Sequence, residues 1–167
     1  MIIDGEHISL PLKHIKHRGF EVVRNEFRKF PDVEIKLPTR ADVGSAGYDF
    51  YSPCDFTISP GQTRIIPMDV KVYMEQDEVL MLYIRSSIGI KKQVVLTNGT
   101  GVVDSTYYNN PDNDGNMHVA LTNYSNNTWE FKVGERLMQG VFMKYFITDD
   151  DQPLAQTRIG GIGSSGK

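Results

Sequence analysis

Cysteine is almost absent from this sequence, and the shortage bears on where the protein works. The chain of 167 residues has one cysteine, Cys54, which cannot form an internal disulfide bond. Small secreted domains are usually held together by several disulfides, so we expect a reducing, cytoplasmic location. The chain also lacks the leading basic and apolar pattern that is typical of a signal peptide.

Two further absences argue against membrane and nucleic-acid partners. No apolar run in the sequence approaches the length of about 20 residues that a membrane-spanning helix needs. The net charge is −3, whereas proteins that bind nucleic acid non-specifically are normally strongly basic. Hydrophobic residues nevertheless make up 40% of the chain, which is enough for one packed core and too many for a disordered chain.

Helical periodicity is scarce after residue 32, where short apolar runs alternate with turn residues. Many short strands at regular spacing indicate an all-β fold, an antiparallel sandwich or jelly roll. We divide the chain into an N-terminal extension of unknown role (1–32), a β domain (33–156) and a C-terminal arm (157–167). Runs typical of strands occupy residues 33–37, 56–58, 62–73, 79–84, 94–96, 117–123, 129–131 and 137–146.

The two ends of the chain differ from this β-rich centre. In the extension, Val23, Phe27 and Phe30 have the spacing of a short amphipathic helix, and we assign this segment no chemistry. Residues 158–167 are rich in glycine and serine, which predicts a flexible arm with few contacts of its own. Residues 161–167 match the first part of a P-loop, but the Ser/Thr and the following helix are missing.

The residues best suited to catalysis lie together in residues 101–107 (Gly-Val-Val-Asp-Ser-Thr-Tyr). Val102 and Val103 indicate a strand, so Asp104 falls at or near the strand end. A carboxylate fixed there is well placed to hold and deprotonate a water molecule. Tyr107 offers a flat apolar face with a polar tip, which suits contact with a sugar.

Groups suited to phosphate follow other strands. Arg85 comes directly after a strand and supplies a planar fork of N–H donors, while Ser86 and Ser87 can complete an anion-binding nest. Gln139 can donate to a phosphate from a strand. Asp49, in a strand entry that contains a glycine, is given a structural role.

Five stretches, in this order, resemble the motifs of the trimeric dUTPases (dUTP diphosphatases) over about residues 33–167. The stretches are residues 46–50, 85–89, 101–107, 134–139 and 158–167. The resemblance implies a distorted jelly roll that assembles as a homotrimer with shared active sites. It also implies an enzyme that hydrolyses dUTP to dUMP and diphosphate, which keeps uracil out of DNA and supplies dUMP for thymidylate synthesis.

The same resemblance implies a role for each site residue. Asp104 would be the general base for water attack on the α-phosphorus, and Tyr107 would lie under the deoxyribose and exclude a 2′-hydroxyl. The hairpin that includes Asn98, Val102 and Val103 would read uracil, mainly with backbone groups. Mg²⁺ would be held chiefly by the triphosphate, with no direct protein ligand. The phosphate-binding residues would be Arg85, Ser86, Ser87 and Gln139, with Arg158, Gly161, Ser164 and Ser165 from the arm.

Three features depart from the family pattern. Residues 108–114 form a loop insertion after Tyr107, where family members usually need one residue. Ile162 replaces the phenylalanine that usually stacks on uracil. Arg158 is one residue closer to the following glycine pair than usual.

Two other functions compete with dUTP hydrolysis. A dCTP deaminase shares the fold and an Arg-Ser-Ser loop, but it needs a glutamate where this chain has Ala120, and a second arginine where it has Gly89-Ile90. A nucleotide-sensing interaction module on the same fold would bind dUTP and signal through the extension or the inserted loop. The retention of Asp104 favours turnover.

Overall fold

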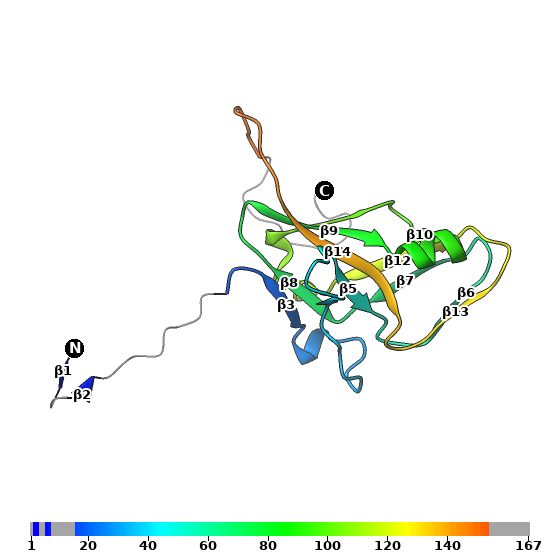
Figure 1. The fold of residues 1–167 in the computed structure, drawn as a ribbon, viewed down its shortest axis with the longest axis horizontal. Coiled ribbons are helices and arrows are strands. Elements are labelled where there is room, and N and C mark those ends of the chain that lie inside the picture. The colour runs from blue at the N-terminus through cyan, green and yellow to red at the C-terminus, as the bar shows by residue number, and fades with distance from the viewer. Residues whose placement is uncertain (1, 4–5, 8–15, 154–167) are drawn as a thin grey trace.

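A computed structural model describes residues 2–3, 6–7 and 16–153 of the chain, and the regular secondary structure of these residues is mostly β-strand (Figure 1). The helical elements are single turns or little more: η1 (Asn25–Phe27), the π-helix η2 (Ser87–Lys92) and η3 (Ser105–Tyr107). None of the described helices has the length and apolar character needed to cross a membrane. The strands are β1 (Ile2–Ile3), β2 (Glu6–His7), β3 (Gly19–Val22), β4 (Thr39–Arg40), β5 (Tyr48–Tyr51), β6 (Phe56–Ile58), β7 (Thr63–Pro67), β8 (Val70–Tyr73), β9 (Glu78–Ile84), β10 (Val94–Leu96), β11 (Gly101–Asp104), β12 (His118–Asn123), β13 (Trp129–Phe131) and β14 (Arg136–Lys144).

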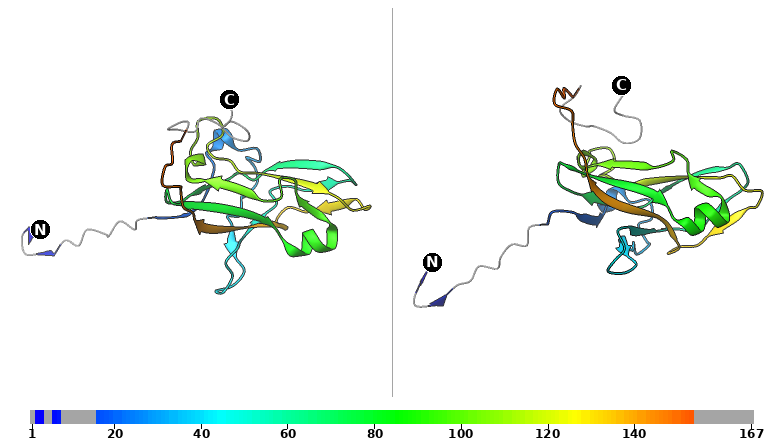
Figure 2. Two further views of the ribbon diagram at one scale, coloured as in Figure 1. Left: turned by 90° about the horizontal axis from the view of Figure 1, so that it is seen from above. Right: turned by 45° about the horizontal axis from the view of Figure 1, so that its top comes forward.

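Two antiparallel sheets make up most of the domain. One has the order β11-β9-β14-β5-β4 and the other the order β10-β12-β7, while β13 pairs with β6 and β3 with β8. The sheets lie one over the other (Figure 2). Leu80 and Met138 of the first sheet and Leu121 of the second are completely buried in one core. The predicted all-β, jelly-roll type of fold is confirmed.

The predicted strands that lie between clear turn signals agree closely with the structure. Residues 56–58, 94–96 and 129–131 form β6, β10 and β13 with the expected bounds. The predicted break of residues 62–73 at Pro67 separates β7 from β8. Apolar alternation and turn chemistry are local properties, so they can be read without knowing the partner strand.

The strand predicted at residues 33–37 was wrong. This segment is an irregular extended stretch whose Ile35 and Leu37 pack partly buried against the core. The Arg28 guanidinium donates to the carbonyls of Phe30 and Val33, so a side chain takes acceptors that a strand partner would use. Apolar alternation here reflects packing without strand pairing.

The amphipathic helix suggested by Val23, Phe27 and Phe30 was also wrong. The carboxylate of Asp69 accepts the backbone N–H groups of Lys29 and Phe30, and the Val23 N–H donates to the Asp69 carbonyl. These bonds hold the segment across the domain and leave only the short η1. Just before it, β3 pairs with β8, so residues 19–30 of the N-terminal segment pack against the sheets.

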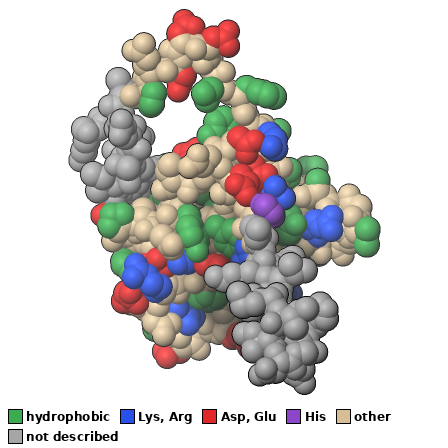
Figure 3. All heavy atoms as spheres, turned by 90° about the vertical axis from the view of Figure 1, so that its left-hand side faces the viewer, with side chains coloured by type: hydrophobic (Ala, Val, Ile, Leu, Met, Phe, Trp, Pro, Cys, Tyr) green, Lys and Arg blue, Asp and Glu red, His purple; other side chains and the backbone are tan. Residues whose placement is uncertain are grey.

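Charges of both signs are mixed on the surface. Arg18 pairs with Glu78 at 2.6 Å and Lys144 with Asp77 at 2.5 Å. On the face seen in Figure 3, basic and acidic side chains lie among one another. The described part of this face is therefore not dominated by either charge sign.

Candidate active site

The turn between β10 and β11, predicted as a hairpin and still called the hairpin below, positions the stretch around Asp104. Its two strands do not pair with each other, since β10 pairs with β12 and β11 with β9. The turn passes through Gly99, whose φ of +76° is a left-handed conformation that suits glycine. The Thr100 hydroxyl donates to the Leu82 carbonyl at 2.7 Å, which ties the turn to β9. Asp104 then ends β11 opposite Val79, half-buried, as the strand-end position in the sequence predicted.

A pocket of about 390 Å³ lies against this hairpin, and we call it the hairpin pocket. Its wall includes the predicted residues Asn98, Val102, Val103 and Tyr107. Val103 and Tyr107 are buried, whereas Val102 is 58% exposed. The other residues that line it are Ile65, Leu82, Leu96, Thr97, Gly101, Met117, His118, Val119, Ala120 and Met138.

The Tyr107 hydroxyl is held by its neighbours. It donates to the Asn116 carbonyl at 2.9 Å and accepts from Asn113 Nδ2 at 2.8 Å. Since the buried ring also lines the hairpin pocket, the pocket has one flat, rigid wall. Asn113 was not singled out in the sequence, because nothing in an Asn- and Asp-rich loop indicates which amide faces the ring.

A second cavity, of about 840 Å³, gathers cationic groups, and we call it the arginine cavity. Arg85 and Ser87 line it, as expected for phosphate-binding residues, and Ser86 lies exposed at the start of η2. The remaining lining residues are Lys36, Tyr51, Ile88, Lys91, Lys92, Trp129, Gly134, Glu135 and Arg136.

Asp49 holds two arginines of this cavity in place. Its buried carboxylate contacts Arg85 Nε at 3.1 Å through one oxygen and Arg136 Nη1 at 3.1 Å through the other. This is the structural role expected for Asp49. An ion pair through Nε fixes the plane of the Arg85 fork, and the other N–H groups of a guanidinium can still bond phosphate oxygens.

Gln139 lies on β14 opposite Asp49 and Tyr83, and it lines neither cavity. It packs against Gly47, where the Cβ of any larger residue would lie 2.7 Å from Gln139 Oε1. A larger residue at position 47 would therefore force the Gln139 side chain to shift. The predicted arm residues Arg158, Gly161, Ser164 and Ser165 lie outside the described residues.

The described residues contain no group of three or more His, Cys, Asp or Glu side chains arranged to hold a metal ion. The two cavities share no lining residue. The hairpin pocket has a rigid, mostly apolar wall, and Asp104 is close to it in the chain. The arginine cavity is lined by cationic side chains. Together they have the character that a nucleoside and its phosphates require.

Known proteins are similar to most of this chain. The family model described as dUTPase matches residues 33–166. Deoxyuridine 5'-triphosphate nucleotidohydrolase of Lactococcus lactis subsp. lactis (strain IL1403) is 42% identical over 153 residues, covering 91% of this chain and 99% of that relative.

Solved structures show the same similarity. The crystal structure of dUTPase from Streptococcus mutans has 40% identity and a TM-score of 0.69, covering 78% of this chain and 98% of that chain. A mutant dUTPase from phage phi11 of S. aureus, described for its structural Mg(II) ion, has a TM-score of 0.65, covering 82% of this chain and 96% of that one. At 18% identity this second likeness shows the fold alone.

Proposed function

The chain belongs to the dUTPase family, and from this premise we propose how its residues carry out the reaction. The enzyme hydrolyses dUTP to dUMP and diphosphate, which keeps uracil out of DNA and supplies dUMP for thymidylate synthesis. The observation that carries the assignment of roles is the hairpin pocket, where the fixed Tyr107 ring lies on the same short segment as Asp104.

Asp104 acts as the general base. A half-buried carboxylate at a strand end is accessible to water and has its direction fixed by the sheet. It takes the proton of the water that attacks the α-phosphorus, a step that needs a base held within hydrogen-bond reach.

The hairpin pocket takes the nucleoside. Tyr107 lies under the deoxyribose, where its closeness excludes a 2′-hydroxyl. The hairpin with Asn98, Val102 and Val103 reads the uracil edge through backbone groups. Rejection of a wrong base edge leaves buried polar groups unpaired, which discriminates more strongly than a missing apolar contact.

The arginine cavity takes phosphate groups. Arg85, oriented by Asp49, bonds phosphate oxygens together with Ser86 and Ser87. The phosphate role predicted for Gln139 has no support from this cavity, which Gln139 does not line. Arg158, Gly161, Ser164 and Ser165 of the arm close over the β- and γ-phosphates. Preorganised cationic and N–H donors of this kind stabilise the charge that develops when a phosphoric anhydride is attacked.

Mg²⁺ is the cofactor and is held chiefly by the triphosphate. Bound to the substrate, Mg²⁺ supplies neutralisation of phosphate charge. The protein contribution is then to orient the phosphates through Arg85 and the two serines.

The active enzyme is a homotrimer with shared active sites. The separation of the hairpin pocket from the arginine cavity supports this proposal, since a single nucleotide needs both kinds of lining. The division of the chain at residues 32 and 156 stays a prediction, as does the cytoplasmic location, which rests on the single Cys54.

The rival functions are not favoured. The position that a deaminase needs as glutamate is Ala120 on β12, in the wall of the hairpin pocket. The Lactococcus lactis relative described above is named as a deoxyuridine 5'-triphosphate nucleotidohydrolase. Three measurements with dUTP, dCTP, UTP and dTTP separate the possibilities. Diphosphate release that is specific to dUTP supports the assignment. Ammonia release from dCTP supports a deaminase, and binding of dUTP without turnover supports a sensing module.

Shared sites are tested by mixing two inactive variants. Asp104→Asn and Arg158→Ala chains are unfolded together in equal amounts and allowed to reassemble. If the two residues of one site come from different subunits, about a quarter of the sites are intact after random closed assembly. Activity no higher than that of the two variants measured apart would exclude sharing of these two residues.

A further inference from the structure

The inserted loop, residues 108–114, folds back against Tyr107. Asn109 and Asp114 adopt left-handed conformations with φ of +55° and +59°, and Gly115 follows at +81°. A Cβ at Gly115 would lie 2.8 Å from the Tyr107 carbonyl oxygen, so this close return needs glycine. The loop therefore lies against the residue that forms the wall of the hairpin pocket.

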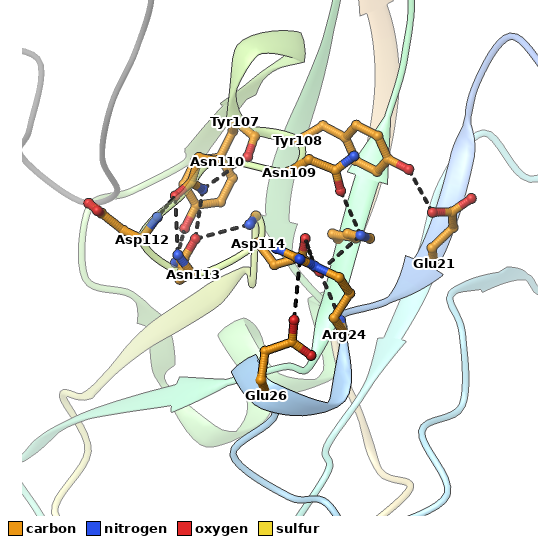
Figure 4. Close-up of polar contacts among 12 residues, drawn as sticks. Glu21, Arg24, Glu26, Tyr107, Tyr108, Asn109, Asn110, Asp112, Asn113 and Asp114 are labelled. Carbon is orange, nitrogen blue, oxygen red and sulfur yellow. Dashed lines mark hydrogen bonds and ion pairs between the residues drawn. The ribbon is translucent and has the colours of Figure 1, made fainter.

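Asn113 is the loop residue that contacts the Tyr107 hydroxyl (Figure 4). Its Nδ2 donates to Tyr107 Oη at 2.8 Å, and that hydroxyl donates to the Asn116 carbonyl at 2.9 Å. Asn110 Nδ2 donates to the Tyr107 carbonyl at 3.0 Å, so the insertion holds both ends of the tyrosine. A hydroxyl that both donates and accepts has little freedom to rotate or to tilt its ring.

The orientation of the Asn113 amide follows from its surroundings. Its Oδ1 accepts from Asn110 Nδ2 at 2.7 Å and from the Gly115 N–H at 3.0 Å, and both of these groups are donors. The amide nitrogen must therefore face Tyr107 Oη and the Asn116 carbonyl, which are the acceptors on the other side.

The far side of the loop is anchored to the N-terminal segment and to β8. Lys71 Nζ contacts Asn109 Oδ1 at 2.6 Å and Asp114 Oδ2 at 2.9 Å. Arg24 bonds Asp114 through its backbone N–H and its guanidinium, and the Tyr108 hydroxyl donates to Glu21 at 2.7 Å. Burial and the Glu21 carboxylate raise the pKa of Tyr108 to about 12, so this hydroxyl stays a donor at neutral pH. The loop is held firmly enough to transmit its position to Tyr107.

We propose that Asn113 is a positioning residue for sugar discrimination: through its bond to the Tyr107 hydroxyl, the inserted loop sets the ring position that excludes a 2′-hydroxyl. The inference rests on the role proposed for Tyr107 under the deoxyribose. It gives the insertion a function at the site that the family motifs do not contain.

The test compares kcat/KM for dUTP and for UTP in four forms of the full chain: the parent, Asn113→Asp, Tyr107→Phe and the double variant. Asn113→Asp keeps an oxygen for Asn110 and Gly115 but cannot donate to Tyr107. Tyr107→Phe keeps the ring face and removes the hydroxyl. One lost hydrogen bond is worth a factor of about three to ten, so each single variant should lower the dUTP/UTP ratio by about that factor.

The double variant identifies the route of the effect. If Asn113 acts through the Tyr107 hydroxyl, the ratio in the double variant equals that of Tyr107→Phe alone. Multiplied losses in the double variant, or a folded Asn113→Asp enzyme with the parental ratio, would overturn the proposal. The matched control is Asp112→Asn in the same loop, which is exposed and points away from the ring (Figure 4), and should keep the parental ratio.

Melting temperatures of all variants are recorded in parallel. If Asn113→Asp does not fold, Tyr107→Phe decides alone, since a parental ratio in that variant shows that the hydroxyl has no part in discrimination. A parent that fails to hydrolyse dUTP, or fails to prefer it to UTP, would contradict the proposed function itself. A selective parent with unchanged variants contradicts only the role of Asn113.

Discussion

Asp104 and Asp114 lie on the same short stretch of chain, on either side of Tyr107, but their surroundings differ sharply. Asp104 ends β11 and is half-buried beside the hairpin. Asp114 is fully buried and contacts Lys71 Nζ at 2.9 Å and Arg24 Nε at 3.0 Å. The two carboxylates are chemically identical, so their roles are decided by burial and by partners.

The pKa of Asp114 shows how those partners act. Burial alone raises the pKa of this carboxyl, but the Arg24 backbone N–H, the Lys71 ammonium and the Arg24 guanidinium all donate to it and hold its pKa below the ordinary value. A carboxylate satisfied in this way has no role left in proton transfer. It stabilises the fold, whereas Asp104 is only half-buried and is the carboxylate proposed above as the general base.

Among substitutions that distinguish Asp104 from Asp114, Asp104→Asn is expected to have the largest effect, and that effect is on turnover. The amide keeps the shape but cannot accept a proton, so kcat for dUTP should fall about 10³-fold, within the range of general-base contributions. Diphosphate release gives the rate, and isothermal titration with a non-hydrolysable dUTP analogue should give a nearly unchanged Kd. The melting temperature is measured in parallel, because Asp104 is half-buried and its replacement can also change stability.

The exposed Asp112 supplies the matched control for that variant. Asp112→Asn removes the same charge from the neighbouring loop and should leave kcat within twofold. Turnover by Asp104→Asn within a few-fold of the parent would remove the general-base assignment. A large loss of stability would instead make Asp104 a structural carboxylate like Asp114.

The second effect is a loss of stability in Asp114→Asn. Removal of one partner from a buried ion pair costs about 3 kcal/mol, which is about 6–12 °C in melting temperature for a chain of this size. Turnover at 25 °C should fall far less than in Asp104→Asn. Scanning calorimetry at equal protein concentration measures the first quantity, and an unchanged Tm would show that Lys71 and Arg24 are satisfied without this carboxylate.

A smaller effect is expected when the pH is lowered, and it concerns the stability that Asp114 contributes. Because the folded pKa of Asp114 is lowered, the unfolded chain binds more protons, and the stability that Asp114 contributes is present above its unfolded pKa. That contribution is lost as the pH falls below about 5 and on through the folded pKa. The gap in Tm between the parent and Asp114→Asn should therefore narrow toward acid, and a constant gap from pH 7 to 3 would contradict the linkage.

The same contrast explains what the sequence could and could not predict. Asp104 was found because its signal is local: a Gly-Val-Val run, a carboxylate at its end and an aromatic ring shortly after. Asp114 carries no such signal. Its role depends on Lys71 of β8 and Arg24 of the N-terminal segment, which are distant in sequence and meet it only in the fold.

Long-range partners also account for the errors in the fold. Strand β3 was missed because its pairing with β8 cannot be seen in the residues of β3 alone. The strand predicted at residues 33–37 was wrong, and its first carbonyl, that of Val33, accepts from the Arg28 side chain instead of a strand partner. Some motif residues do line the cavities, Asn98, Val102, Val103 and Tyr107 in the hairpin pocket and Arg85 and Ser87 in the arginine cavity, whereas Gln139 lines neither.

The smallest effect on stability is expected from Arg24→Ala. This variant tests how much each of the two cations, Arg24 and Lys71, contributes to stabilising the Asp114 carboxylate. The variant loses the guanidinium contact at 3.0 Å but keeps the backbone N–H bond at 2.8 Å and the contact with Lys71. The Arg24 side chain is 55% exposed, so solvent screens its pairing. We expect a loss of about 0.5–1 kcal/mol, or about 1–4 °C in melting temperature.

Glu26→Gln is the control for Arg24→Ala. It removes the exposed partner that Arg24 contacts at 3.2 Å without touching Asp114, and it should leave the melting temperature unchanged.

Because Lys71 still holds Asp114, the inserted loop should keep its place, and the dUTP/UTP ratio of Arg24→Ala should stay within twofold of the parent. A loss as large as that of Asp114→Asn would mean that the N-terminal guanidinium, and not the buried ammonium, is the main partner of this carboxylate. The anchoring of the loop would then depend on the N-terminal segment, and the dUTP/UTP ratio should fall with the stability.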